Sequence, residues 1–124
     1  MRLFVYGSLK PGGWAERLLK DRVENPRNAS ANGFLFDCGS FPALKPEPRL
    51  GEDGYPVRGV LYDVIEGMET VLVMELDVLE GYPDLFDRVE LDILCEGKIV
   101  SALTYIGKDE NLFNNPIIPG PWQV

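Results

Sequence analysis

Glu80 is the residue of this chain whose position most suggests chemistry. A helix is predicted over Gly67–Glu80, and Leu72, Leu76 and Glu80 follow one another in steps of four along one face of it. This spacing aims a carboxylate at the apolar side of the helix, just before the helix stop at Gly81. Burial and the negative end of the helix dipole both raise a carboxyl pKa, which makes Glu80 a candidate general base. The alternative is a solvated last-turn glutamate.

Two further side chains are weaker candidates. Asp77 precedes Glu80 by three residues and falls on the more polar side of the helix. Tyr105 stands near the end of a predicted strand, where it is either a core aromatic residue or a wall of a pocket, and the core position is favoured.

The second candidate site is the turn within "FVYGSLKPGG", residues 4–13. Gly7, Ser8 and Leu9 can present successive N–H groups to an anion, and Tyr6 and Ser8 add hydroxyls. The alternative is a strand that ends at Gly7 and turns. Ser8 is a poor nucleophile because the chain has no histidine to activate it and no lysine three residues later.

Composition excludes several kinds of site. With no histidine, the chain has no Ser-His or Cys-His triad and no histidine-ligated metal site. Cys38 and Cys95 lie far apart and form no metal or redox motif, so two buried thiols are expected. No metal and no cofactor are expected, and any proton transfer falls to Asp, Glu, Lys or Tyr.

Charge and length set the expected class of protein. The formal net charge of −8 makes nucleic-acid binding unlikely as a role, and no apolar stretch is long enough to span a membrane. The 124 residues predict a single domain over 1–124 in a cytoplasmic protein.

The elements that must position these residues are mostly strands. Alternating or apolar runs predict strands at 1–6, 57–64, 88–94 and 98–107, with a tight hairpin turn at "CEGK". A short helix is predicted at 14–21 and a loop at 24–33. A strand and a second extended piece are predicted within 34–46, followed by a flexible loop rich in Pro and Gly, and an extended tail is predicted at 114–122. Because strands and helices do not alternate, the predicted class is α+β, with a small, curved, mostly antiparallel mixed β-barrel flanked by short helices.

In order and spacing, several segments resemble the gamma-glutamylcyclotransferase-like superfamily, particularly its short branch of avirulence-induced-type and gamma-glutamylamine cyclotransferase-like proteins. The resemblance covers nearly the whole chain and is carried by "FVYGSLKPG", "GSFPAL", "VRGVLYDV", "LDVLEGYP", "ALTYI" and the closing Gly-x-Trp.

The resemblance implies a function and a set of site residues. It implies a cofactor-independent enzyme that cyclises a small gamma-glutamyl amine or peptide to 5-oxoproline and releases the amine. Glu80 would accept and return the proton, and Tyr6, Gly7, Ser8 and Leu9 would bind the glutamyl end. Phe86-Asp87-Arg88 departs from the family's frequent Tyr-x-Arg, which removes one possible hydroxyl from the pocket. The alternative is a non-catalytic module that binds an acidic metabolite in the same pocket.

Overall fold

The computed structural model describes residues 1–7, 9–10, 12–13, 15–46 and 54–117. The elements in chain order are β1 (Arg2–Val5), η1 (Glu16–Leu19), β2 (Val23–Asp37), β3 (Pro42–Pro46), β4 (Tyr55–Val64), α1 (Glu69–Glu80), β5 (Phe86–Cys95), β6 (Lys98–Gly107) and η2 (Glu110–Leu112). The expected flexible loop and the end of the expected tail lie outside the described residues. Within these ranges, no helix is long and apolar enough to cross a membrane.

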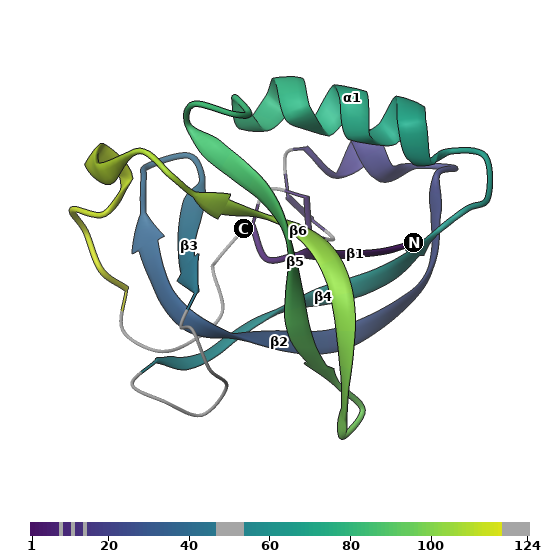
Figure 1. Ribbon diagram of the computed structural model, residues 1–124, viewed down its shortest axis with the longest axis horizontal. Coiled ribbons are helices and arrows are strands. Elements are labelled where there is room, and N and C mark those ends of the chain that lie inside the picture. The colour runs from purple at the N-terminus through teal and green to yellow at the C-terminus, as the bar shows by residue number, and fades with distance from the viewer. Residues whose placement is uncertain (8, 11, 14, 47–53, 118–124) are drawn as a thin grey trace.

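Among the described residues, six strands form one sheet in the order β3-β2-β4-β1-β6-β5, and a further pairing of β2 with β5 closes it. The result is a five-stranded barrel of β2, β4, β1, β6 and β5, with β3 added beside β2 (Figure 1). Only the β1–β6 pairing is parallel among those described. The predicted class, an α+β mixed barrel with mainly antiparallel strands and short helices, is therefore confirmed.

The core consists of two apolar clusters that share β1. One cluster draws residues from all five barrel strands and therefore fills the barrel interior. The other lies between the outside of the barrel and α1, which runs across one end of the molecule (Figure 1). Side chains along β1 alternate between them, because Phe4 and Tyr6 belong to the interior cluster while Leu3 and Val5 belong to the outer one. The residues that follow β1 thus emerge where the two clusters meet.

The prediction of a loop at 24–33 is wrong, because this segment is part of β2. Its residues alternate in burial: Ala29 and Ala31 face the interior, whereas Asn28 is exposed and Ser30 is only partly buried. The strand pairs with β4, with one irregularity between Glu24 and Arg27. The high content of Asn, Pro and Gly concealed a two-residue alternation that is carried by small side chains.

The helical predictions need smaller corrections. In α1, Leu72 and Leu76 are fully buried, but Met68 and Val71 from the predicted apolar stripe are 36% and 42% exposed. The segment predicted as a helix at 14–21 contains the four-residue 3-10 helix η1. Gly81 ends α1 in the left-handed conformation, with φ of 63°, as its position predicts. The predicted hairpin is also present, with Cys95 opposite Lys98.

Candidate active site

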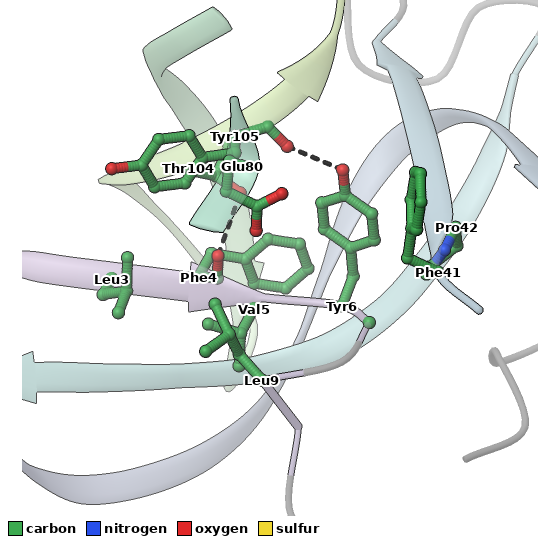
Figure 2. A pocket seen from close by; sticks show the side chains of 11 residues that line it. Leu3, Phe4, Val5, Tyr6, Leu9, Phe41, Pro42, Glu80, Thr104 and Tyr105 are labelled. Atoms are coloured by element: carbon green, nitrogen blue, oxygen red, sulfur yellow. Dashed lines mark hydrogen bonds between the residues drawn. The ribbon is translucent and has the colours of Figure 1, made fainter. Parts of the chain in front are cut away.

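A small cavity lies where the end of β1, the strand β6 and the last residue of α1 come together. Its walls are contributed by Leu3, Phe4, Val5, Tyr6, Gly7, Leu9, Phe41, Pro42, Glu80, Thr104 and Tyr105 (Figure 2). The volume of about 30 Å³ corresponds to one or two water molecules.

Glu80 contributes a carboxylate to this cavity. It is partly buried on the same side of α1 as Leu72 and Leu76, and its carboxylate points between Tyr6 and the residues of β1 (Figure 2). Burial raises the pKa of Glu80 to about 7 from an ordinary value of 4.5. A carboxyl group with such a pKa exchanges protons readily near neutral pH.

The hydroxyl groups around Glu80 donate to other acceptors. Tyr6 Oη donates to the carbonyl of Tyr105 at 2.6 Å, and Thr104 Oγ1 donates to the carbonyl of Phe4 at 2.9 Å (Figure 2). Tyr105 Oη donates to Asp77 Oδ1 at 2.6 Å. In the described structure no hydrogen bond reaches the Glu80 carboxylate. The carboxylate is therefore removed from water without receiving donors in exchange, which explains why burial dominates its pKa.

Tyr6 also accepts a hydrogen bond at its hydroxyl, from the backbone N–H of Leu44 at 3.1 Å. It thereby ties β1 to both β3 and β6. Burial, and then the nearby charge of Glu80, raise the pKa of the Tyr6 phenol far above its ordinary value, so this group stays protonated. Tyr6 is thus a neutral part of the wall that retains one acceptor position.

Asp77, the weaker carboxylate candidate, has two donors. Arg88 Nη1 donates to Asp77 Oδ2, and Tyr105 donates to the other oxygen. Partial burial works to raise the pKa of Asp77, but the hydrogen bonds from Arg88 and Tyr105 outweigh it and hold the pKa below its ordinary value. Asp77 is therefore ionised at neutral pH and bonded into the fold.

The structure brings Gly7 and Leu9 to the same cavity as Tyr6 and Glu80. A Cβ atom at Gly7 would lie 2.7 Å from Pro42 Cδ and Cγ, so a side chain there requires Pro42 to shift. Ser8, the remaining predicted binding residue, lies outside the described residues.

The sequence predictions did not assign Phe41, Pro42 or Thr104 to the site. Phe41 and Pro42 belong to "GSFPAL" and Thr104 to "ALTYI", so the segment resemblance was the available signal. Phe86, where the resemblance led us to expect a lost hydroxyl in the pocket, is only 2% exposed and packs edge-on against Phe41 with ring centroids 5.9 Å apart. Its ring supports the wall from behind. Tyr105 meets both expectations, because it is 4% exposed and also lines the cavity.

Comparisons with known proteins identify relatives in sequence and in fold. A family model described as gamma-glutamyl cyclotransferase, AIG2-like, matches residues 3–124. Gamma-L-glutamyl-butirosin B gamma-glutamyl cyclotransferase of Niallia circulans is 34% identical over 111 residues, which cover 84% of this chain and 65% of that protein. The chain therefore spans slightly less than two thirds of that relative's length.

Solved structures show the same fold. An AIG2-like protein from Mus musculus matches with a TM-score of 0.67 at 23% identity, over 90% of this chain and 80% of that one. YkqA from Bacillus subtilis matches with a TM-score of 0.73 at 24% identity, over 98% of this chain and 39% of that one. At these identities the likeness concerns the fold alone.

Proposed function

Because this chain belongs to the AIG2-like gamma-glutamyl cyclotransferase family, we propose that it cyclises a gamma-glutamyl amine or peptide to 5-oxoproline and releases the amine. The observation that carries the proposal is the environment of Glu80. This carboxylate faces a cavity, receives no hydrogen bond within the described structure and has a pKa of about 7. Such a group can both accept and return a proton at neutral pH.

The proposed reaction balances without water, a metal or a cofactor. The α-amino nitrogen of the substrate attacks its own γ-carbonyl carbon, and the bond from that carbon to the departing nitrogen breaks. The attacking nitrogen loses two protons as it changes from an ammonium group to the ring amide. The departing nitrogen gains two protons as it leaves as an ammonium ion, so Glu80 can carry them between the two nitrogens with no net consumption.

Substrate binding is assigned to the turn after β1. Gly7, Ser8 and Leu9 would offer N–H donors to the glutamyl end, and the ring of Tyr6 would form the adjacent wall. The crowding of Gly7 against Pro42 supports a role for backbone rather than side chain at this position. Apolar neighbours such as Leu3 and Val5 limit the access of water, whose attack would give hydrolysis instead of cyclisation.

The test is release of 5-oxoproline from a panel of gamma-glutamyl amines, gamma-glutamyl dipeptides and glutathione. We expect turnover of at least one member by the parent protein, and a loss of about 10²- to 10⁴-fold in kcat for Glu80→Gln. Glu75→Gln is the matched control, because Glu75 lies on the same helix but is exposed and pairs with Arg22. This control should retain the parental rate.

Binding of the same compounds, measured by calorimetry, distinguishes the proposed enzyme from a non-catalytic binding module. Glu80→Gln should bind the turned-over compound with an affinity within a few-fold of the parent, because the amide preserves the shape of the side chain. Binding without turnover in the parent protein would favour the non-catalytic module for acidic metabolites. Parental turnover by Glu80→Gln would remove Glu80 from the mechanism.

A further inference from the structure

Asp77 collects two donors from directly opposite positions of neighbouring strands. Arg88 on β5 and Tyr105 on β6 are partners in the antiparallel register, so their side chains leave the sheet side by side. Both reach the Asp77 carboxylate, one at each oxygen. The Arg88 guanidinium also lies over the ring of Tyr82, 4.5 Å from its centroid, in the turn that follows α1. The arginine is thus held on the Asp77 side of the last helical turn.

Within the described residues, few charged groups are linked by hydrogen bonds to the cavity around Glu80. On its own helix, Asp77 lies three residues earlier, which is close to one turn. Tyr6 on β1 and Tyr105 on β6 line the cavity, and burial holds the pKa of both phenols far above neutral, so both are uncharged. Cys38, between β2 and β3, acts electrostatically on Tyr6, and burial raises the pKa of this thiol. Asp77 on α1 and Arg88 on β5 are the ionised groups that hydrogen bonds link to this cavity, through the hydroxyl of Tyr105.

We infer that Asp77 is a positioning residue of the proposed active site, which binds Arg88 and the Tyr105 hydroxyl and so keeps a cation and a donor away from Glu80. The inference rests on the proposed function for its catalytic consequence. Asp77 takes no proton from the substrate in this scheme, and it acts through the two side chains that it holds.

The physical reason is that Glu80 serves as a base only while nothing else stabilises its charged form. An opposite charge within about 4–6 Å typically lowers a carboxyl pKa by about 1–3 units. A guanidinium released from Asp77 carries its full charge on a flexible stem beside the last turn of α1. Glu80 would then resemble an ordinary glutamate in a salt bridge, ionised at neutral pH but a weak acceptor of protons.

The primary experiment is a titration of the Glu80 carboxyl group by carbon-13 NMR in the free protein. In Asp77→Asn we expect the pKa of Glu80 to fall by about one unit or more, and the midpoint of the pH–rate profile to move down with it. Glu75→Gln removes the same charge from the same helix and also releases an arginine, Arg22, so it controls for net charge. It should leave the pKa of Glu80 within about 0.3 units of the parent value, because Glu75 is exposed and screened.

Two further variants test the direction of the effect. Asp77→Glu keeps the carboxylate and should restore the Glu80 midpoint to near the parent value. Arg88→Met leaves Asp77 without its cation, so the pKa of Glu80 should rise above the parent value instead of falling. A merely structural role for the pair predicts lower stability in both Asp77→Asn and Arg88→Met, with no opposite movements of the Glu80 midpoint.

The outcomes distinguish this inference from the proposed reaction. If Asp77→Asn moves the Glu80 titration no further than Glu75→Gln does, or if Arg88→Met moves it downward, the positioning role is wrong. The NMR titration requires no substrate, so it tests the positioning role even if no compound in the panel is cyclised. The role requires the Asp77→Asn shift to disappear in the Arg88→Met background, because a shift that persists there comes from the loss of the Asp77 charge alone. Conversely, if a compound is cyclised but the pKa of Glu80 does not change in Asp77→Asn, the proposed reaction is supported and the positioning role of Asp77 is wrong.

Discussion

The two carboxylates on the last turn of α1, Asp77 and Glu80, lie in opposite environments. On one side, Asp77 receives hydrogen bonds from Arg88 and Tyr105, and its pKa lies below the ordinary value. On the other side, Glu80 faces the cavity without a donor in the described structure, and burial raises its pKa to about 7. Environments that move two neighbouring pKa values apart are typical of acid–base sites. The comparison supports a structural role for Asp77 and the proton-transfer role proposed for Glu80.

The difference depends on the direction in which each hydroxyl points. The Tyr105 hydroxyl donates a hydrogen bond to Asp77, and the Tyr105 carbonyl accepts one from the Tyr6 hydroxyl. Tyr105 therefore contacts residues on both sides of the turn. Thr104, the neighbouring residue of β6, bonds back to β1. The hydroxyl groups of Thr104 and Tyr105 on β6 thus donate to acceptors other than Glu80, which leaves that carboxylate available for the proposed proton transfer.

The largest effect expected on stability concerns Glu80→Gln at alkaline pH. The folded pKa of Glu80 lies above the ordinary value of 4.5, so its burial is fully compatible with folding below pH 4.5 and disfavours folding as the pH rises through 7. The difference corresponds to about 3 kcal/mol, which Glu80→Gln should recover at pH 8 and not at pH 4. Urea denaturation of both proteins at the two pH values measures this. Equal stability at pH 8 would show that the Glu80 carboxylate is solvated.

The rate of the proposed reaction should report the same pKa. Because Glu80 must be ionised to accept a proton, kcat/KM should fall tenfold per pH unit below 7, and so lie about 100-fold below its plateau at pH 5. Initial rates in a constant-ionic-strength buffer series measure the profile. A plateau that extends down to pH 5 would place the active base on a carboxylate like Asp77, with a low pKa, and would reverse the comparison.

Tyr6→Phe tests whether the cavity hydroxyl belongs to the framework or to Glu80. The change removes the buried bonds to the Tyr105 carbonyl and the Leu44 N–H, so the free energy of unfolding should fall by about 2 kcal/mol. The pKa of Glu80 should stay within about half a unit of the parent value, because the phenol donates elsewhere. Thermal denaturation and carboxyl NMR measure the two quantities. A marked rise in the Glu80 pKa would reveal that Tyr6 donates to Glu80.

The sequence allowed one side of this comparison to be predicted and not the other. Glu80 could be placed on the apolar row of α1 because that row depends only on local helical spacing. The predicted hairpin turn at "CEGK" sets Arg88 opposite Tyr105, but no local pattern brings this pair of residues to Asp77 on α1.

The same limit applies elsewhere in the fold. The crowding of Gly7 arises from Pro42, which is distant in sequence and comes close only once the barrel has formed. In β2, the small interior residues Ala29 and Ala31 were hidden among turn-forming residues, so residues 24–33 of this strand were predicted as a loop. Contacts within one helix or across one tight hairpin were thus predictable from the sequence, whereas contacts between elements distant in the chain required the structure.

Tyr105→Phe should produce the smallest effect and separate the two carboxylates most cleanly. Asp77 loses one of its donors but keeps Arg88, so its pKa should rise toward the ordinary value of 3.8 and the free energy of unfolding should fall by about 1 kcal/mol. A depressed carboxyl pKa stabilises the fold above that ordinary value, so the loss should be complete at neutral pH and shrink as the pH falls below 4. Carbon-13 NMR resolves both carboxyl groups in one sample, and the pKa of Glu80 should hardly move. If the pKa values of Glu80 and Asp77 changed by equal amounts, the two sides of the turn would form one coupled site, and the division of roles between them would be wrong.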